Sequence, residues 1–325
     1  MPIHLIIGAG AGLVSAALFG SAAASPALAV ILFYLAPLPL CLAGLGWGRS
    51  ASLVAALTGT VVILLSLGLG AALIFGFVFA GPIVILIHLV LLSRPVAAPQ
   101  GETAGSVEWY PAGRLVGWAA VMAGILAGLF VLLVGLDQES YRQSITDFLS
   151  NPALKDLDPD GKLFTPETIK NLTAVLAKAL PGMIAMTWLT IVLFDLWLAG
   201  VIVEASGRAL RPWPDLHALE LPNGLVAVFA IAILVSFVPG VIGLLATGFV
   251  GAMLLAYVLQ GLAVIHVYSR GVPFRGLMLA LVYLGILLLG WVAILVAILG
   301  LGEPLFGLRA RNARGGRPPK DNQTD

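Results

Sequence analysis

The sequence predicts an all-α protein that crosses a membrane many times, and three observations carry that prediction. Of its 325 residues, 60% are apolar and only 10% are Asp, Glu, Lys or Arg, whereas about a quarter of residues are charged in an ordinary soluble domain. Residues 1–48, 50–93, 115–136, 221–269 and 276–302 contain no charged side chain. A membrane helix needs about 20 apolar residues, so each block holds one or two spans. A soluble globular protein is thereby excluded.

Clusters of Gly, Pro and Ser divide these blocks into about nine predicted spans, with eight as the alternative. The weakest divisions fall at residues 67–70 and at Pro239-Gly240, where one bent helix is the alternative. The predicted spans are 3–23, 27–46, 51–69, 71–92, 114–136, 182–203, 222–238, 240–266 and 276–301. They form an N-terminal group within 1–136 and a C-terminal group within 182–303.

The first span, 3–23, passes directly into the next and has no Lys or Arg before it. We therefore expect an uncleaved membrane helix here rather than a secretory signal, although small residues at 27–29 resemble a cleavage site. Gly8, Gly12 and Ala16 form a ridge of small residues, which is typical of helix packing in membranes. A phosphate-binding loop is excluded because no strand precedes these glycines.

Residues 137–181 form a hydrophilic insertion, in which 12 of the 33 charged residues occur. The pattern predicts two amphipathic helices joined by an acidic turn, the second opening with Thr165 as N-cap and Pro166 in its first turn. The predicted apolar faces are Tyr141, Ile145, Phe148 and Leu149, then Ile169, Leu172, Leu176 and Leu180. We expect these faces to lie on the bilayer surface or against the helix bundle, with a partner-binding site as the alternative.

The acidic turn has the spacing of a calcium-binding EF-hand loop. Asp156, Asp158, Asp160 and Glu167 stand at positions one, three, five and twelve, with Gly161 at position six. Prolines within and around the loop oppose this interpretation, and the sequence has no second copy to pair with it. A plain acidic turn before a capped helix is therefore favoured, calcium is the alternative, and no other cofactor is predicted.

Asp195 is the best single candidate for a functional residue, because an ionisable group at bilayer depth costs about 2.5–3.5 kcal/mol and normally faces a polar cavity or a partner. Trp188 shares its side of the helix, whereas Glu204 points the other way, so the two acids are not a catalytic pair. Tyr257 and Gln260 share a face of another span. The candidate substrate-binding residues are Asp195, Trp188, Tyr257 and Gln260, with a structural role for each as the alternative.

Several other features carry weaker signals. Pro37, Pro39 and Pro181 are expected to break helices, where freed carbonyl groups line a cavity or, more commonly, where the helix kinks. Cys41 is the sole cysteine, so an intramolecular disulfide and a cysteine-based metal cluster are excluded. The four histidines lack the spacing of a zinc site, and no nucleophile or paired-carboxylate motif is present, so the sequence predicts no enzyme.

The basic residues predict the orientation in the membrane. Arg309, Lys320 and three arginines between them follow the last span, which predicts a cytoplasmic C-terminus and a disordered basic tail over 304–325. With nine spans the insertion lies on that same side and the N-terminus on the other. With eight spans both termini are inside.

The sequence resembles a known family over nearly its whole length. The run Arg211-Pro212-Trp213-Pro214-Asp215-Leu216, followed by Leu221-Pro222, the run Gln260-Gly261-Leu262-Ala263-Val264-Ile265-His266, and the end of the last span before Arg309 resemble the YybS-like bacterial membrane proteins of unknown function. That family is similar at fold level to the S components of energy-coupling-factor transporters. The resemblance implies a bacterial inner-membrane protein that captures a ligand and docks on an ATPase module, with Arg211, Trp213, Asp215, Gly261 and His266 as family-motif positions.

The sequence thus leaves two hypotheses of different class. In the first, the protein transports a small molecule, as an S-component-like capture subunit or a stand-alone carrier, and Asp195 binds a cation or proton beside a shared cavity. In the second, it is a non-transporting membrane scaffold or assembly factor. A net charge of +1 gives no argument for nucleic acid, the lipid bilayer is the predicted partner, and ridges of small residues permit a homo-oligomer.

Overall fold

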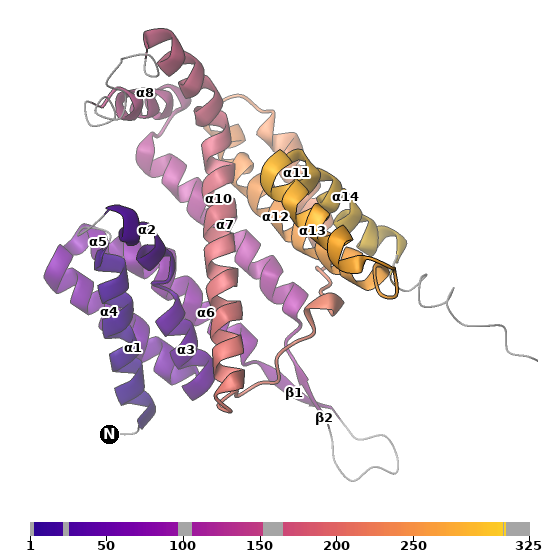
Figure 1. The fold of residues 1–325 in the computed structure, drawn as a ribbon. Coiled ribbons are helices and arrows are strands. Elements are labelled where there is room, and N and C mark those ends of the chain that lie inside the picture. The colour runs from indigo at the N-terminus through magenta and orange to yellow at the C-terminus, as the bar shows by residue number, and fades with distance from the viewer. Residues whose placement is uncertain (1–2, 22–25, 97–105, 152–164, 308, 310–325) are drawn as a thin grey trace, which may run out of the picture.

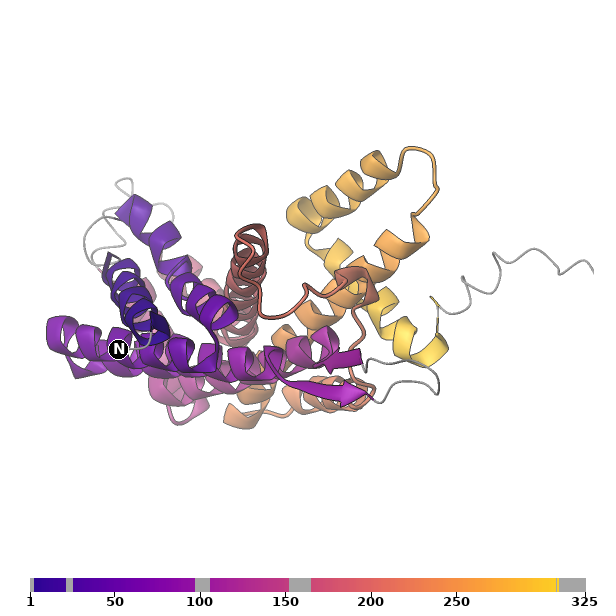
Figure 2. The ribbon, with the colours of Figure 1, turned by 90° about the horizontal axis from the view of Figure 1, so that it is seen from below.

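The fold was analysed in a computed structural model that describes residues 3–21, 26–96, 106–151, 165–307 and 309 (Figure 1). Within them the chain is almost entirely helical, as predicted. Figure 2 shows the long helix α10 nearly end-on, with the N-terminal helices on one side and the C-terminal helices on the other. Helix α7 (Ala112–Val134), which belongs to the predicted N-terminal group, packs against both α10 (Pro166–Ala205) and α12 (Val241–Tyr268), so the two predicted groups share a helix interface.

The N-terminal group is a set of apolar helices, one of which is extended by a π-helical segment, η2. The elements are α1 (Ile3–Gly20), α2 (Pro26–Tyr34), α3 (Leu38–Trp47), α4 (Arg49–Leu67), α5 (Leu69–Ile74), η2 (Phe75–Ala80), α6 (Gly81–Val90) and α7 (Ala112–Val134). Residues 35–37 form the predicted break between α2 and α3. The glycine cut at 67–70 is a true helix boundary, because Gly68 adopts φ +88° between α4 and α5.

The C-terminal group begins after the insertion helix α8 and the long helix α10. The elements are α8 (Gln138–Leu149), α10 (Pro166–Ala205), the 3-10 turn η3 (Leu216–Ala218), α11 (Gly224–Ser236), α12 (Val241–Tyr268), α13 (Arg275–Leu289) and α14 (Trp291–Phe306). Gly240 has φ +91° between α11 and α12, so the division at Pro239-Gly240 is also a true boundary.

Seven helical segments of the described chain are long and apolar enough to cross a membrane, and three apolar helices are shorter. The seven are Ile3–Gly20, Val30–Trp47, Arg49–Leu67, Leu69–Val90, Ala112–Val134, Pro166–Ala205 and Val241–Tyr268. The range 276–301, predicted as one span, instead holds α13 and α14. Gly290 adopts φ +59° and turns the chain, and Val292 then packs back beside Gly285. The apolar run around Gly290 hides this turn from a hydropathy pattern.

A two-stranded hairpin follows α6 and was not predicted. Strand β1 (Ser93–Val96) pairs antiparallel with β2 (Ser106–Trp109), with Arg94 opposite Glu108. The side chains of this pair form a salt bridge with an N···O distance of 2.7 Å. The hairpin lies outside the apolar helices, at the end of the molecule from which α7 begins (Figure 1).

The insertion packs against the bundle, as one of the two expected arrangements. Tyr141, Ile145 and Leu149 of α8 are buried in a small cluster with residues of α7, α10 and α12. The prediction that Phe148 belongs to this buried face is wrong, because its side chain is 66% exposed and is not part of the cluster. The N-cap carboxylate of α8 accepts hydrogen bonds from Ser140 backbone and side chain, which hold the pKa of Asp137 below its ordinary value.

The second insertion helix and the sixth predicted span are one continuous helix, α10, of 40 residues. Thr165 caps it and Pro166 stands in its first turn, as predicted. Pro181 was expected to open a new helix, but it lies inside α10. It is buried there, and its neighbour Gly182 packs closely on Gly251 of α12, so tertiary packing compensates for the missing hydrogen bond. Leu172, predicted on the apolar face, is 37% exposed.

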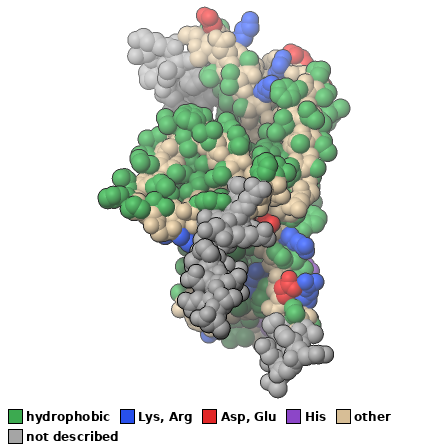
Figure 3. All heavy atoms as spheres, turned by 90° about the vertical axis from the view of Figure 1, so that its right-hand side faces the viewer, with side chains coloured by type: hydrophobic (Ala, Val, Ile, Leu, Met, Phe, Trp, Pro, Cys, Tyr) green, Lys and Arg blue, Asp and Glu red, His purple; other side chains and the backbone are tan. Residues whose placement is uncertain are grey.

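The described helices give the molecule two polar ends and an apolar belt. Figure 3 shows a broad band of hydrophobic side chains with charged groups gathered above and below it. We call the end with β1 and β2 the hairpin end and the opposite one the α8 end (Figure 1). Basic residues of helix ends and connections at the hairpin end are Arg49, Arg94, Arg114, Arg208, Arg211, Arg270 and Arg275. Those at the α8 end are Arg142, Lys170 and Lys178.

The nine-span layout is wrong in one respect. It placed the insertion on the same side as the C-terminal segment, whereas the structure places α8 at the end opposite the hairpin (Figure 1). Arg309 donates a hydrogen bond to the His217 carbonyl, in the connection 206–223 that follows α10 at the hairpin end. The extra turn at Gly290 explains the difference, since it returns the chain to the end from which α13 starts.

Small residues set the closest contact of the N-terminal group. Gly8 and Gly12 of α1 face the backbone of α4, and a Cβ at Gly8 would come within 2.6 Å of the Ala51 carbonyl oxygen. A Cβ at Gly12 would likewise collide with the backbone of Ala55 and Gly59. The predicted ridge of small residues on α1 is thus a helix interface.

We expect Gly12→Leu to destabilise the bundle by about 1–3 kcal/mol, because the larger side chain overlaps the α4 backbone. Gly10→Leu is the matched control, since a Cβ at Gly10 meets no atom within 4 Å. Thermal unfolding of the purified variants in detergent should show a lower Tm for the first alone. Equal Tm values would contradict the close α1–α4 contact.

Candidate functional site

Asp195 lies inside the bundle, on the face of α10 that packs against α3. It is fully buried, and neither carboxylate oxygen has a hydrogen-bond partner among the described residues. Cys41 of α3 lies within electrostatic reach of the carboxylate. An ionised carboxylate without a donor or a cation is expensive to bury. The site therefore requires a proton or a bound cation on Asp195.

Trp188 lies seven residues, or about two helical turns, before Asp195 on the same face, and its indole is hydrogen-bonded to the backbone. The Nε1–H donates a hydrogen bond of 2.7 Å to the carbonyl of Val78 in η2. Four residues after Val78 stands Pro82, which has no N–H to donate to that carbonyl. Trp188 therefore joins α10 to the irregular part of the fourth predicted span.

Gln260 likewise joins separate elements in the C-terminal group, and it uses both the nitrogen and the oxygen of its side-chain amide. The side-chain nitrogen donates to the Gly300 carbonyl at 2.9 Å, and the side-chain oxygen accepts from the Leu221 N–H at 2.6 Å. Pro304 follows Gly300 by four residues, so this carbonyl too lacks its helical donor. Gln260 thus bridges α12, α14 and the connection before α11.

Tyr257 is buried one turn before Gln260. Its ring stacks on Phe229 of α11 with 5.5 Å between the ring centroids, and its hydroxyl has no partner among the described residues. Gly300 packs against the Tyr257 backbone, and Gly261 packs against the backbone of Val296. The α12–α14 crossing therefore depends on glycine at both positions.

The structure distributes the four candidate residues over three interfaces. Trp188 contacts η2 and Asp195 faces α3, whereas Tyr257 and Gln260 face α11 and α14. Their predicted binding of substrate stays a prediction. Gln260 and Trp188 have structural hydrogen bonds, which leaves Asp195 and Tyr257 with unpartnered polar atoms within the described chain.

A large cavity lies on another side of α10. Its volume is about 540 Å³, and it is bounded by α7, α10, α12, α13 and the connection 206–223. Its lining residues are Ala112, Leu115, Val116, Thr190, Leu193, Phe194, Leu196, Trp197, Trp213, Pro214, Leu216, His217, Leu219, Leu255, Leu259, Leu262, Ala263, His266 and Tyr283. Asp195, Trp188, Tyr257 and Gln260 are not among them. At 100° per residue, Trp197 points about 200° away from Asp195.

The polar groups of the cavity gather near the hairpin end. The rings of His217 and His266 lie 5.6 Å apart between centroids, and Tyr283 lies 5.9 Å from His266. Asp215 accepts hydrogen bonds from the His217 backbone N–H at 2.9 Å and forms a 2.8 Å contact with the ring Nδ1. These bonds hold the pKa of Asp215 below its ordinary value.

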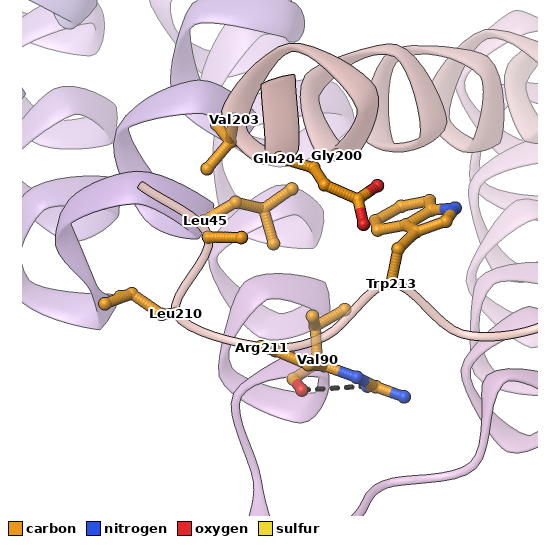
Figure 4. Close-up of a pocket in the computed structure, with 9 residues that line it drawn as sticks. Leu45, Val90, Gly200, Val203, Glu204, Leu210, Arg211 and Trp213 are labelled. Atoms are coloured by element: carbon orange, nitrogen blue, oxygen red, sulfur yellow. Dashed lines mark hydrogen bonds between the residues drawn. The ribbon is translucent and has the colours of Figure 1, made fainter. Parts of the chain in front are cut away.

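The connection 206–223 is held against the ends of α6 and α10. Figure 4 shows Arg211 extended toward Val90 and Trp213 directed toward α10. The Arg211 guanidinium donates to the Val90 carbonyl at 2.9 Å, at the end of α6. Trp213 fills the notch above Gly200, where a Cβ would collide with the indole ring. These contacts fix the connection that forms one wall of the cavity.

Glu303 and Arg309 form a buried ion pair at the end of α14. Their side chains are 6% and 14% exposed and approach to 2.9 Å. Arg309 also donates to the His217 carbonyl at 2.9 Å. The pair is buried because the chain after α14 returns across the connection 206–223.

The calcium prediction lies mostly outside the described residues. Asp156, Asp158 and Asp160 fall in 152–164, and only Glu167, exposed in the first turn of α10, is described. Within the described chain no group of three or more His, Cys, Asp or Glu side chains could hold a metal.

His217 is the cavity residue that the sequence did not indicate. It is 49 positions from His266, in a loop without metal-ligand or catalytic spacing, and only the packing of η3 on α12 joins them. The Asp215-x-His217 spacing was the available signal, since a side chain two residues after an aspartate can return to its carboxylate.

We expect Gln260→Leu to destabilise the protein by about 1–3 kcal/mol, because it leaves the Leu221 N–H and the Gly300 carbonyl unpaired in an apolar environment. Gln143→Leu, on the exposed side of α8, is the control. Urea or thermal unfolding in detergent measures the difference. A Gln260→Leu protein as stable as the control would contradict the bridging role.

Comparison with known proteins gives one match. No curated protein and no solved structure shows significant similarity to the chain. A family model described as "Predicted membrane protein (DUF2232)" matches residues 13–302, which is nearly the whole chain. The chain therefore belongs to this DUF2232 family of predicted membrane proteins. Its apolar helices agree with that description.

Proposed function

We propose that the protein transports a small molecule, which it binds in the cavity between α7, α10 and α12. The observation that carries this proposal is the cavity itself. Its volume of about 540 Å³ falls within the range of about 300–1,000 Å³ that is typical of ligand sites. Its lining is largely apolar with a few polar groups at one end, which is the usual composition of such sites.

Asp195 supports transport from the opposite side of α10. A carboxylate without donors requires a proton or cation at bilayer depth, and α10 connects that site rigidly to the cavity wall. We propose that Asp195 binds the coupling ion, and that substrate and ion occupy separate sites. No catalytic reaction is proposed, because the sequence offers no recognisable set of catalytic residues.

The mode of transport follows from the family resemblance. The YybS-like motif positions and the fold-level likeness to S components favour a capture subunit that docks on an ATPase module, and a stand-alone carrier is the other form. The scaffold alternative has less support, since the apolar face of α8 is buried against the bundle rather than presented to a partner.

The distribution of basic residues favours a cytoplasmic hairpin end in a bacterial inner membrane. Arginines concentrate there, and Arg309 lies at the same end, so the positive-inside rule and the proposed C-terminal orientation agree. The insertion helix α8 then lies on the outer side.

We expect the gently purified protein to retain a small molecule that mass spectrometry detects. Leu259→Trp should reduce its amount by about tenfold or more, because a larger ring fills a fully apolar part of the cavity. Leu234→Trp, on a 71% exposed position of α11, should retain it. A co-purified ATPase in all three samples would specify the capture subunit.

Two results would contradict transport through this cavity. One is the absence of any retained molecule from the wild-type protein together with stable protein partners, which is the scaffold outcome. The other is equal retention by the Leu259→Trp and Leu234→Trp proteins.

We expect a cysteine at position 143 to react with a membrane-impermeant maleimide in intact spheroplasts, and a cysteine at position 94 to react only after lysis. The Gln143→Cys and Arg94→Cys proteins compare the α8 end with the hairpin end. The wild-type protein is the control, because its one cysteine, Cys41, is buried. The reverse labelling pattern would place the hairpin outside.

A further inference from the structure

The polar end of the cavity combines two histidines whose rings are oriented by other groups. His217 Nδ1 contacts the Asp215 carboxylate at 2.8 Å, and His266 Nδ1 contacts the Leu262 carbonyl at 2.9 Å. Both partners are acceptors, so in each ring Nδ1 carries the proton. Nε2 is then the atom of each ring that a ligand in the cavity can reach.

The remainder of the lining is chemically different. Among the described residues that line the cavity there is no Asp, Glu, Lys or Arg, and apart from Tyr283 and Thr190 the other groups are apolar or present an aromatic ring. Thr190 donates its hydroxyl to the Met186 carbonyl of its own helix. The part of the cavity farther from the histidines, lined by Thr190 and Leu255, therefore suits a hydrocarbon chain, and the histidine end suits one polar group.

The same lining residues indicate which charge the polar group of a ligand would carry. The histidines are the two lining groups that offer a ring nitrogen, and the Asp215 carboxylate orients the ring of His217 from behind. No described carboxylate lines the cavity to repel an anion. Arg270 lies within electrostatic reach of Asp215, which adds positive potential to this end.

The following inference rests on the proposed function. We propose that the substrate is a single-chain amphiphile with an acidic head, of the fatty-acid class. Its chain occupies the apolar cavity toward the bilayer centre, and its carboxyl group binds Nε2 of His217 and His266 at the hairpin end. The protonated acid donates to a neutral Nε2, or the carboxylate accepts from an imidazolium Nε2–H. One proton is shared in both forms, and no covalent bond changes.

The position of the cavity fits this class of ligand. His217 belongs to η3 in a surface connection and His266 lies in the last turn of α12, so both mark the membrane boundary. Leu255 lies near the middle of α12, and Leu193 lies about three turns before the end of α10. An amphiphile taken up from the bilayer would therefore keep its head at the interface and its chain at the depth it already had.

The test uses the full-length protein in lipid vesicles and a spin-labelled stearic acid, with its methyl ester as the neutral probe of the same chain. Electron paramagnetic resonance measures the motionally restricted fraction of each probe. We expect the wild-type protein to bind the acid about tenfold more strongly than the ester, as charge-assisted hydrogen bonds at the head would produce. The variant with both His217→Phe and His266→Phe should lose this preference while its binding of the ester is unchanged.

Phenylalanine preserves the ring contacts with Tyr283, so unchanged ester binding also shows that the double variant is folded. His88→Phe, at an exposed position of α6 outside the cavity lining, is the control and should retain the preference for the acid. Spin-labelled phosphatidylcholine provides the bilayer-lipid comparison. A restricted fraction that is equal for acid, ester and phospholipid, or a preference for acid that survives the double substitution, overturns the proposal.

This result is separable from the test of transport. If Leu259→Trp removes a retained molecule but the acid shows no preference, the cavity is a transport site for another class of substrate and only this inference fails. If the purified protein retains no molecule and neither probe is restricted, both fail.

Discussion

In a bilayer each backbone carbonyl must find a donor within the protein, and prolines inside the helices make that constraint specific. Pro304 removes the α-helical donor for the Gly300 carbonyl, and Pro82 has no N–H to offer the Val78 carbonyl four residues before it. The indole of Trp188 and the amide of Gln260 supply the replacements, from helices that are distant in the sequence. The freed carbonyls therefore determine which helices must meet, and at what height. The arrangement of α10 on η2 and of α12 on α14 depends on these hydrogen bonds.

Glycine provides the second requirement, since a long polar side chain can reach a carbonyl only where the backbones approach closely. Gly261 and Gly300 lie at the crossing of α12 and α14, beside Gln260. Gly200 accommodates Trp213, and so holds the connection 206–223 against α10. Helices α10 and α12 are in close contact at Gly182 and Gly251, and toward the hairpin end of the same two helices, beyond this contact, the bundle opens into the cavity. The cavity is thus a consequence of where close packing stops.

The sequence predicted what depends on local composition. The spans, their boundaries at Gly68 and Gly240, the cap at Thr165 and the ridge at Gly8 all follow from short-range rules. It failed at Gly290, because a left-handed turn in an apolar run has no hydropathy signal. It failed again at Pro181, where contact between α10 and α12 overrides the local tendency to end the helix.

The candidate site was less predictable, because it too depends on contacts between helices that are distant in the sequence. Burial of Asp195 follows from one charge in an apolar run, and the structure places it inside the bundle. That Gln260 serves a proline-freed carbonyl requires knowledge of α14, and that His217 meets His266 requires the path of the connection. Pairings between segments separated by 40 or 49 positions are set by tertiary packing, which no single-helix pattern contains.

Helix α10 joins the two parts of the proposed mechanism. Asp195 faces α3 and Trp197, two residues later, faces the cavity, so one helix presents the proposed ion site to one side and the proposed substrate site to the other. In the proposed mechanism, a change of charge on Asp195 would alter how α10 packs on α3, and a shift of α10 would displace the cavity wall. The cost of an exposed charge at this depth, about 2.5–3.5 kcal/mol, limits the coupling that this device can supply. Since 1.4 kcal/mol is a factor of ten, the two sites can alter each other's affinity by about a hundredfold. That limit is sufficient for coupled transport, and it requires no direct contact between ion and substrate.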